Sequence, residues 1–172
     1  GFFPNPRARR LPVLVQVCVQ SLRFLDQTHS QGLVVLQEDN GDRVLPIWIG
    51  PSEATAIAIE LAHAKFPRPL THDLLTSVLG GLGGVLQRVV ISRVEENTYF
   101  AEMVIQRGDQ VITIDARPSD SIAVALRTKA QIYAHDGLLE AMSLDASEDP
   151  HIVIAEHLES GSCNSEEMAA DE

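Results

Sequence analysis

An internal repeat constrains the fold of this 172-residue chain more than any other feature of its sequence. Gly50–Ile59 (GPSEATAIAI) aligns without a gap with Arg117–Leu126 (RPSDSIAVAL), 67 residues further along the chain. At the same offset, the Gly-Asp pair that begins at Gly41 aligns with the pair that begins at Gly108. Self-similarity of this kind indicates a structural unit that is used twice. A chance similarity between two amphipathic helices is the alternative.

Each copy of the repeat is predicted to form a β-hairpin followed by a helix. Asn40-Gly41 in the first copy and Gly108-Asp109 in the second supply the positive φ angles that a tight turn needs. A segment rich in alternating apolar or β-branched residues precedes each hairpin, over residues 13–20 and 85–94. We therefore expect three strands and then a helix in each half of the chain.

Both repeated helices have a recognisable start in the sequence. Pro51 and Pro118 suit the first helical position. Two residues later, Glu53 and Asp120 each place a negative charge near the positive end of the helix. The alanines that follow keep one face of each helix small, which permits close packing of the helix against a sheet.

The remaining segments complete the predicted fold. A helix is expected from Thr71, a good N-cap, to about Leu79, because the four glycines that follow oppose further helix. Ile132-Tyr133 is predicted to be a short strand and Asp136–Met142 a short helix. The predicted fold class is α+β, with an internally duplicated strand-hairpin-helix unit around a mixed or antiparallel sheet.

The net charge of −11 is concentrated at one end of the chain. Residues 145–172 hold nine acidic residues and no lysine or arginine, so the rest of the chain is nearly neutral. We expect an N-terminal extension over residues 1–11, a folded domain over 12–144 and a solvated, mobile acidic tail over 145–172. With 11 arginines and two lysines, any contact with nucleic acid is expected to be local.

The sequence predicts a cytoplasmic protein without a membrane span. Its two cysteines lack the spacing of a metal or redox motif, which favours a reducing compartment. No apolar run approaches the roughly 18 residues that a spanning helix needs. Arg7, Arg9 and Arg10 before an apolar run resemble a secretion signal, but Gln16 interrupts that run and no small-residue cleavage site follows.

No strong catalytic fingerprint such as a P-loop, GxSxG, HExxH or CxxC is present, so the candidate chemistry rests on two polar clusters. In the first cluster, Asp115 and Arg117 lie at the end of a predicted strand, and Asp120 follows in the first helical turn. Asp115 and Asp120 are candidate catalytic residues and metal ligands, and Arg117 is a candidate phosphate ligand, as a phosphodiesterase requires. An internal salt bridge with a capped helix is the simpler interpretation.

The second cluster runs from Arg68 to Asp73. His72 is a candidate for proton transfer, Asp73 for orienting His72 or binding metal, and Arg68 for binding phosphate. The polar first turn of an ordinary exposed helix is the alternative interpretation. Glu53 is either a third metal-binding carboxylate, near Asp120 if the two halves face each other, or a helix-start charge.

Aromatic residues make up only 5% of the chain, so few rings are available to stack on bases. Trp48 is the single tryptophan and stands between Ile47 and Ile49. We expect Trp48 to anchor the core or a subunit interface rather than to serve as a stacking platform.

Three ungapped blocks resemble the bifunctional nuclease family, long catalogued as a domain of unknown function. The blocks are Leu45–Gly50 (LPIWIG), Arg68–Leu75 (RPLTHDLL) and Asp115–Arg127 (DARPSDSIAVALR), within a match over about residues 12–144. The resemblance implies a compact α+β domain able to dimerise, and plant members are described as nucleases that act on RNA and DNA. It brings no settled catalytic set, so the roles given to the polar residues above are our inference.

Two functions are compatible with the sequence. The first is a homodimeric nuclease that acts on RNA or DNA and depends on Mg²⁺ or Mn²⁺. The second is a non-catalytic dimeric binding or assembly module, in which the polar clusters only hold the helix starts. The relative positions of Arg68, His72, Asp115 and Asp120 discriminate between them, because groups more than about 12 Å apart cannot all serve one metal and phosphate through contacts of ~2–3 Å.

Overall fold

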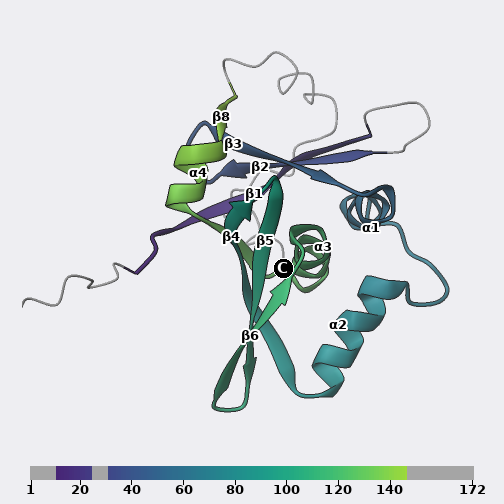
Figure 1. The fold of residues 1–172 in the computed structure, drawn as a ribbon. Coiled ribbons are helices and arrows are strands. Elements are labelled where there is room, and N and C mark those ends of the chain that lie inside the picture. The colour runs from purple at the N-terminus through teal and green to yellow at the C-terminus, as the bar shows by residue number, and fades with distance from the viewer. Residues whose placement is uncertain (1–10, 25–30, 147–172) are drawn as a thin grey trace, which may run out of the picture.

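The computed structural model describes residues 11–24 and 31–146, which form one mixed sheet and four helices (Figure 1). The strands are β1 (Leu14–Phe24), β2 (Gly32–Glu38), β3 (Arg43–Ile49), β4 (Gly84–Glu95), β5 (Thr98–Arg107), β6 (Gln110–Ala116), β7 (Gln131–His135) and β8 (Leu144–Asp145). The helices are α1 (Pro51–Leu61), α2 (Thr71–Gly81), α3 (Pro118–Thr128) and α4 (Asp136–Met142). The predicted α+β class is confirmed, whereas the predicted N-terminal extension and acidic tail fall almost wholly outside the described residues.

The eight strands are ordered β6-β5-β4-β7-β1-β2-β3-β8 across the sheet. The late strand β7 pairs antiparallel with β1 and parallel with β4, so it joins the antiparallel unit β1–β2–β3 to the antiparallel unit β4–β5–β6. A helix follows each unit, α1 after β3 and α3 after β6. This is the element order expected from the sequence, while a duplication of the unit stays a prediction.

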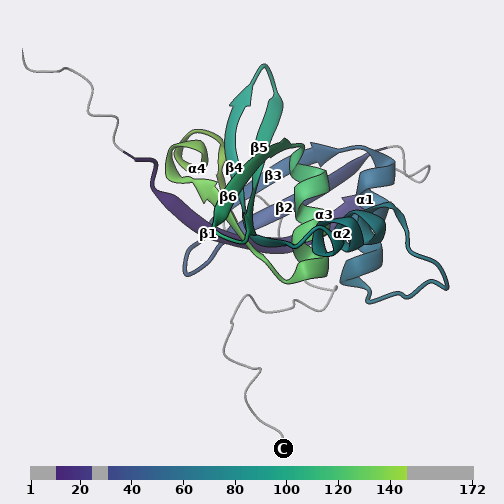
Figure 2. The ribbon, with the colours of Figure 1, turned by 90° about the horizontal axis from the view of Figure 1, so that it is seen from below.

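The two halves of the sheet run in different directions, so that β1–β3 cross the top of Figure 1 while β4–β6 run downward. Helices α1, α2 and α3 lie together on one side of this bent sheet, and α4 lies on the other side (Figures 1 and 2). The main core is built from the sheet together with α1 and α3, and contains fully buried side chains such as Leu36, Ile57, Ile91 and Ile122. The packing of α1 and α3 on one core brings their N-terminal turns near each other.

Small residues allow α1 to approach the sheet closely. A Cβ atom added at Gly32 of β2 would lie 2.5 Å from the Cβ atom of Ala54, which is itself fully buried in α1. Real Cβ atoms do not approach so closely, so this position must lack a side chain. The alanine-rich face of the helix thus has the packing role that the sequence predicts.

The predicted hairpin turns and helix starts are confirmed. Asn40 and Gly108 have positive φ angles of 61° and 56° in the two turns. Helices α1 and α3 begin at Pro51 and Pro118, each at the first helical position. These features depend on the local backbone, which is why the sequence alone predicts them.

Helix α2 departs from the prediction at both ends. Its N-cap is Leu70 rather than Thr71. The helix also continues to Gly81, past the predicted end at Leu79. The C-cap residue is Leu82, and Gly83 directly after it adopts the left-handed conformation with a φ of 80°, which turns the chain away from the helix.

The described residues can be compared with the expected absence of a membrane span. From Leu14 onward, the apolar run that resembles a secretion signal lies in strand β1. Within residues 11–24 and 31–146, no helix is long and apolar enough to cross a membrane.

Candidate functional site at three helix starts

The N-terminal turns of α1, α2 and α3 meet at a network of four side chains. Arg117, at the N-cap of α3, places its guanidinium Nη1 3.1 Å from Glu53 Oε1 in α1 and its Nε 2.8 Å from Asp120 Oδ2 in α3. The other oxygen of Asp120, Oδ1, lies 2.9 Å from His72 Nε2 in α2. The structure therefore brings together four of the residues that the sequence singles out, from helices distant in the chain.

A second ion pair joins α2 to α3 beside this network. The backbone N–H of Leu70 donates to Asp73 Oδ2 at 2.9 Å, and Arg127 Nε donates to Asp73 Oδ1 at 2.8 Å. The Arg127 side chain is only 5% exposed, and it also donates to the carbonyl oxygens of Ala123 at 2.8 Å and Ala56 at 3.2 Å. Sequence reasoning missed this arginine, although an arginine at the end of an otherwise apolar helix was a usable signal.

Two predicted site residues lie outside the network. Arg68 is exposed in the loop before α2, and Asp115 is exposed on β6, opposite Glu102 of β5. Neither side chain makes a hydrogen bond or ion pair with the part of the chain that the structure describes. Of the four residues whose positions discriminate between the two functions, only His72 and Asp120 are in contact.

Hydrogen bonds hold the two aspartates of this region, Asp120 and Asp73, in the ionised form. Burial raises the pKa of Asp120, but hydrogen bonds from Arg117 and His72 outweigh this effect and lower the pKa below its ordinary value. A backbone N–H at the helix start and then Arg127 lower the pKa of Asp73. The hydrogen bond to Asp120 raises the pKa of Arg117. Both aspartates are therefore negative and Arg117 is positive at neutral pH.

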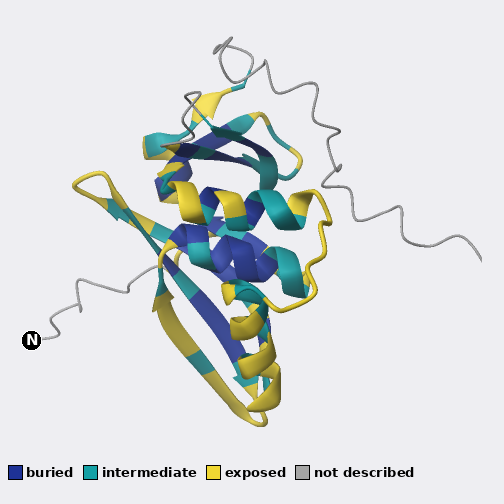
Figure 3. Cartoon of the chain, turned by 90° about the vertical axis from the view of Figure 1, so that its right-hand side faces the viewer, coloured by how far each residue is buried: buried dark blue, intermediate teal, exposed yellow. Residues whose placement is uncertain are grey.

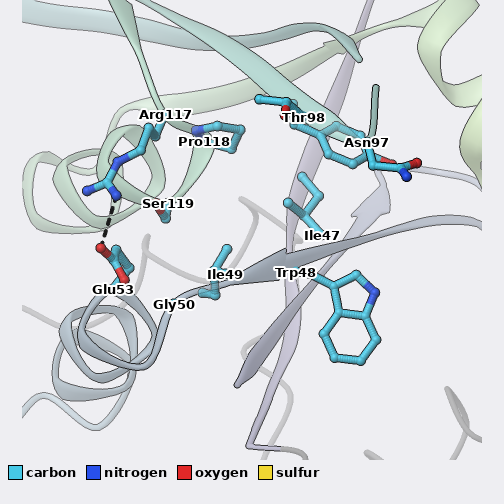
Figure 4. Close-up of a pocket in the computed structure, with 11 residues that line it drawn as sticks. Ile47, Trp48, Ile49, Gly50, Glu53, Asn97, Thr98, Arg117, Pro118 and Ser119 are labelled. Atoms are coloured by element: carbon cyan, nitrogen blue, oxygen red, sulfur yellow. Dashed lines mark ion pairs between the residues drawn. The ribbon is translucent and has the colours of Figure 1, made fainter. Parts of the chain in front are cut away.

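A cleft of about 290 Å³ opens beside the ion pair of Arg117 and Glu53 (Figure 4). Its walls come from the end of β3, the start of α1, the turn between β4 and β5, and the start of α3. The described residues that line the cleft include Arg117 and Glu53 but not His72 or Asp120. The Arg117 side chain is 65% exposed, whereas that of His72 is 13% exposed. A ligand in the cleft therefore meets Arg117 and Glu53 first.

As arranged, the predicted metal ligands do not fit a divalent cation. The described residues contain no group of three or more His, Cys, Asp and Glu side chains that could hold a metal ion. The guanidinium of Arg117 bridges Glu53 and Asp120 and so takes the place that a cation shared by these two carboxylates would need. Asp115 lies outside the network. The requirement for Mg²⁺ or Mn²⁺ stays a prediction.

Trp48 is not in the core, so that part of the prediction is wrong. Its side chain is 62% exposed, whereas Ile47 is buried and Ile49 packs against the main core. Successive side chains of a strand point to opposite faces, so Trp48 points away from the core that its neighbours face. Among the described residues, strand β8 pairs with β3 only at Arg43 and Val44, so no described strand covers the Trp48 end of this edge of β3.

The chain has relatives among known proteins. An uncharacterized protein of Mycobacterium tuberculosis is 44% identical over 120 residues, which is 70% of this chain and 71% of that protein. Bifunctional nuclease 2 and Bifunctional nuclease 1 of Oryza sativa subsp. japonica are 26% and 25% identical, over 81% and 69% of this chain and 44% and 38% of their own lengths. The model of the bifunctional nuclease domain matches residues 34–147. The chain thus belongs to the bifunctional nuclease domain family.

Proposed function

We propose that this protein is a nuclease that hydrolyses phosphodiester bonds of RNA or DNA at the cleft beside Arg117 and Glu53. The observation that carries the proposal is an exposed guanidinium beside a carboxylate in a cleft of a bifunctional nuclease domain. The rice relatives that are named bifunctional nucleases support the same reaction class.

Arg117 is the phosphate ligand in this proposal. Asp120 and Glu53 hold its Nε and Nη1 groups, while Nη2 makes no hydrogen bond to the described part of the chain. A guanidinium that two carboxylates hold in place, and whose Nη2 stays available, suits a phosphate, because Nη2 can donate charge-assisted hydrogen bonds to phosphate oxygens. His72 positions Arg117 indirectly, because it contacts Asp120 and Asp120 contacts Arg117.

Glu53 is the proposed base. A phosphate bound to Arg117 competes with Glu53 for the guanidinium, and the released carboxylate accepts a proton from the attacking water. The water oxygen forms a bond to phosphorus while the bond from phosphorus to the leaving nucleoside oxygen breaks. The proton then passes from Glu53 to that oxygen, which completes the hydrolysis.

Cleavage of labelled single-stranded RNA and DNA by the purified protein tests this proposal. We expect Arg117→Gln and Glu53→Gln each to lower kcat at least about 100-fold, the usual effect of losing a general base or a charged transition-state ligand. Arg107→Gln is the matched control, because Arg107 is an exposed arginine at the end of β5. Reactions with Mg²⁺, Mn²⁺ and EDTA test the metal requirement separately.

Two results would contradict the assignment. Unchanged cleavage by both cleft variants would place the activity at another site or in a contaminant. An equal loss in the Arg107→Gln control would show that the assay reports the general charge of the protein rather than the cleft.

Helix α2 favours the second candidate function, a dimeric assembly module. None of its residues is buried, and Figure 3 shows it as largely exposed. Its apolar side chains Leu74, Leu75 and Val78, with Leu82 and Val85 just beyond, are between 43% and 65% exposed. Monomeric proteins rarely leave so many large apolar residues together in water. We propose that two copies of the chain pack α2 against α2 around a two-fold axis.

Size-exclusion chromatography with light scattering tests the dimer. The wild type is expected at twice the mass of the chain, and Val78→Glu at the mass of the monomer. Leu144→Glu places the same charge on an exposed apolar position of β8, at the far end of the sheet, and is expected to stay dimeric. A monomeric wild type would refute the dimer, and a dimer without cleavage of any nucleic acid would favour the assembly module over the nuclease.

A further inference from the structure

Trp48 and Arg117 line the same cleft, and this combination indicates which form of nucleic acid the cleft receives. We infer that the cleft binds an unpaired nucleotide, with its phosphate on Arg117 and its base stacked on Trp48. The protein then selects single-stranded over double-stranded nucleic acid. This inference rests on the proposed function and adds the substrate class to it.

The indole is placed for contact with a ligand. In the view of Figure 4, the ion pair of Arg117 and Glu53 lies to the left and Trp48 to the right, with Ile49 and Gly50 between them. Trp48 also lines a second hollow of about 410 Å³ together with Gln31, Ile49 and Gly50. A planar ligand therefore has room beside the ring.

An exposed indole and an exposed cation in one cleft are a common combination for binding single strands. Stacking of one base on an aromatic side chain contributes about 1–3 kcal/mol, and it tolerates any base because every base has a π-face. The positive charge of Arg117 supplies the backbone contact that such sites also need. A protein partner fits this cleft less well, because the cores of protein interfaces are depleted of acidic residues such as Glu53.

The turn between β4 and β5 forms a further wall of the cleft and adds a polar group to it. Glu96 and Asn97 both have positive φ angles, 49° and 62°, as in the tight two-residue turns of β-hairpins. Asn97 lines the cleft, and a side-chain amide can both donate to and accept from a base edge. A base inside a duplex is already paired and stacked, so it cannot reach Trp48 and Asn97 without leaving the helix.

Tryptophan fluorescence measures this contact directly, because Trp48 is the only tryptophan in the chain. The full chain is titrated with a single-stranded oligonucleotide that carries hydrolysis-resistant phosphorothioate linkages, and separately with a blunt duplex of the same length. We expect saturable quenching by the single strand and no quenching by the duplex. Equal quenching by both would overturn the proposed selectivity.

The variant Trp48→Ala tests the energetic contribution of the ring. Its affinity for a dye-labelled single strand, measured by fluorescence anisotropy, is expected to fall about 5- to 150-fold, the equivalent of about 1–3 kcal/mol. Phe66→Ala removes another half-exposed ring, in the loop between α1 and α2, and is expected to leave the affinity unchanged. Equal losses in the two variants would overturn the stacking role.

Two further outcomes separate this inference from the proposed function. Binding with quenching but without cleavage would support the stacking site and refute the nuclease, whereas cleavage that does not depend on Trp48 would refute the stacking site and leave the nuclease standing. A change of Trp48 emission on dilution without nucleic acid would show that a second copy of the chain covers the ring, and would overturn the inference.

Discussion

Replacing Asp120 by asparagine should destabilise the protein measurably, because this carboxylate joins α3 to α2 and holds Arg117, which in turn contacts Glu53 of α1. It accepts hydrogen bonds from Arg117 at 2.8 Å and from His72 at 2.9 Å. Asparagine has nearly the same shape but no charge. The substitution therefore weakens two charge-assisted hydrogen bonds and removes a negative charge from the first turn of α3 without creating a cavity.

The magnitude follows from the exposure of the partners. The bond to His72 joins side chains that are 13% and 28% exposed, so its weakening costs about 1 kcal/mol. The bond to Arg117 involves a mostly exposed partner, so solvent screening reduces it to about 0.5 kcal/mol. The lost charge at the helix start costs about 0.5 kcal/mol more. Together these give about 2 kcal/mol, which lowers the Tm of a domain of this size by about 4–8 °C.

Urea unfolding and thermal melting, both followed by circular dichroism, measure this change. Asp115→Asn is the matched control, because the exposed side chain of Asp115 makes no hydrogen bond or ion pair in the described part of the chain. We expect it to change the free energy of unfolding by less than about 0.5 kcal/mol. Equal effects of the two substitutions would refute the structural role that we give to the network.

Three other perturbations have defined outcomes. Because the folded pKa values of Asp73 and Asp120 lie below the ordinary aspartate value of about 3.9, their contribution to stability is complete above about pH 5 and is lost as the pH falls through the folded values. Urea unfolding at pH 7, 5 and 3.5 checks this, and constant stability down to pH 3.5 would contradict it. Gly32→Ala should destabilise the protein by about 1–3 kcal/mol through overpacking, whereas Gly80→Ala, in open space on α2, should stabilise it by about 0.5–1 kcal/mol. Thermal melts measure both changes, and shifts of Tm in the same direction for the two substitutions would disprove the close approach of α1 to the sheet. Arg127→Met should lower the free energy of unfolding by about 3 kcal/mol, because it removes a buried cation from Asp73 and from two carbonyl oxygens. A loss below about 1 kcal/mol on urea unfolding would show that these contacts of Arg127 contribute little.

The local features of the fold follow from short stretches of sequence. The turns at Asn40 and Gly108 and the helix starts at Pro51 and Pro118 lie where the sequence predicts them. Each depends on the steric limits of a few neighbouring residues. The end of α2 was less predictable, because two glycines inside a helix cost only about 1 kcal/mol each and the surroundings decide whether that cost is met.

The arrangement of the sheet depends on contacts between distant segments. Strand β7 enters between β1 and β4 and pairs with both, which unites the two halves in one sheet. The sequence indicates a short strand at this place but not its neighbours. Pairing partners are chosen by burial and register over the whole sheet, which no short segment contains.

The candidate site shows the same division between what short stretches of sequence indicate and what contacts between distant segments decide. By itself, the sequence marked His72, Asp120, Glu53 and Arg117 as candidates, because charged residues at helix starts and strand ends are visible in the order of the chain. Only the tertiary structure decided that Arg117 contacts Glu53 of α1 and that Asp115 lies outside the network. It also decided that Arg127 contacts α1 and α2 from α3, and that the indole of Trp48 on β3 faces solvent. Backbone conformation is governed by neighbours along the chain, whereas which side chains meet is governed by the packing of segments far apart in sequence.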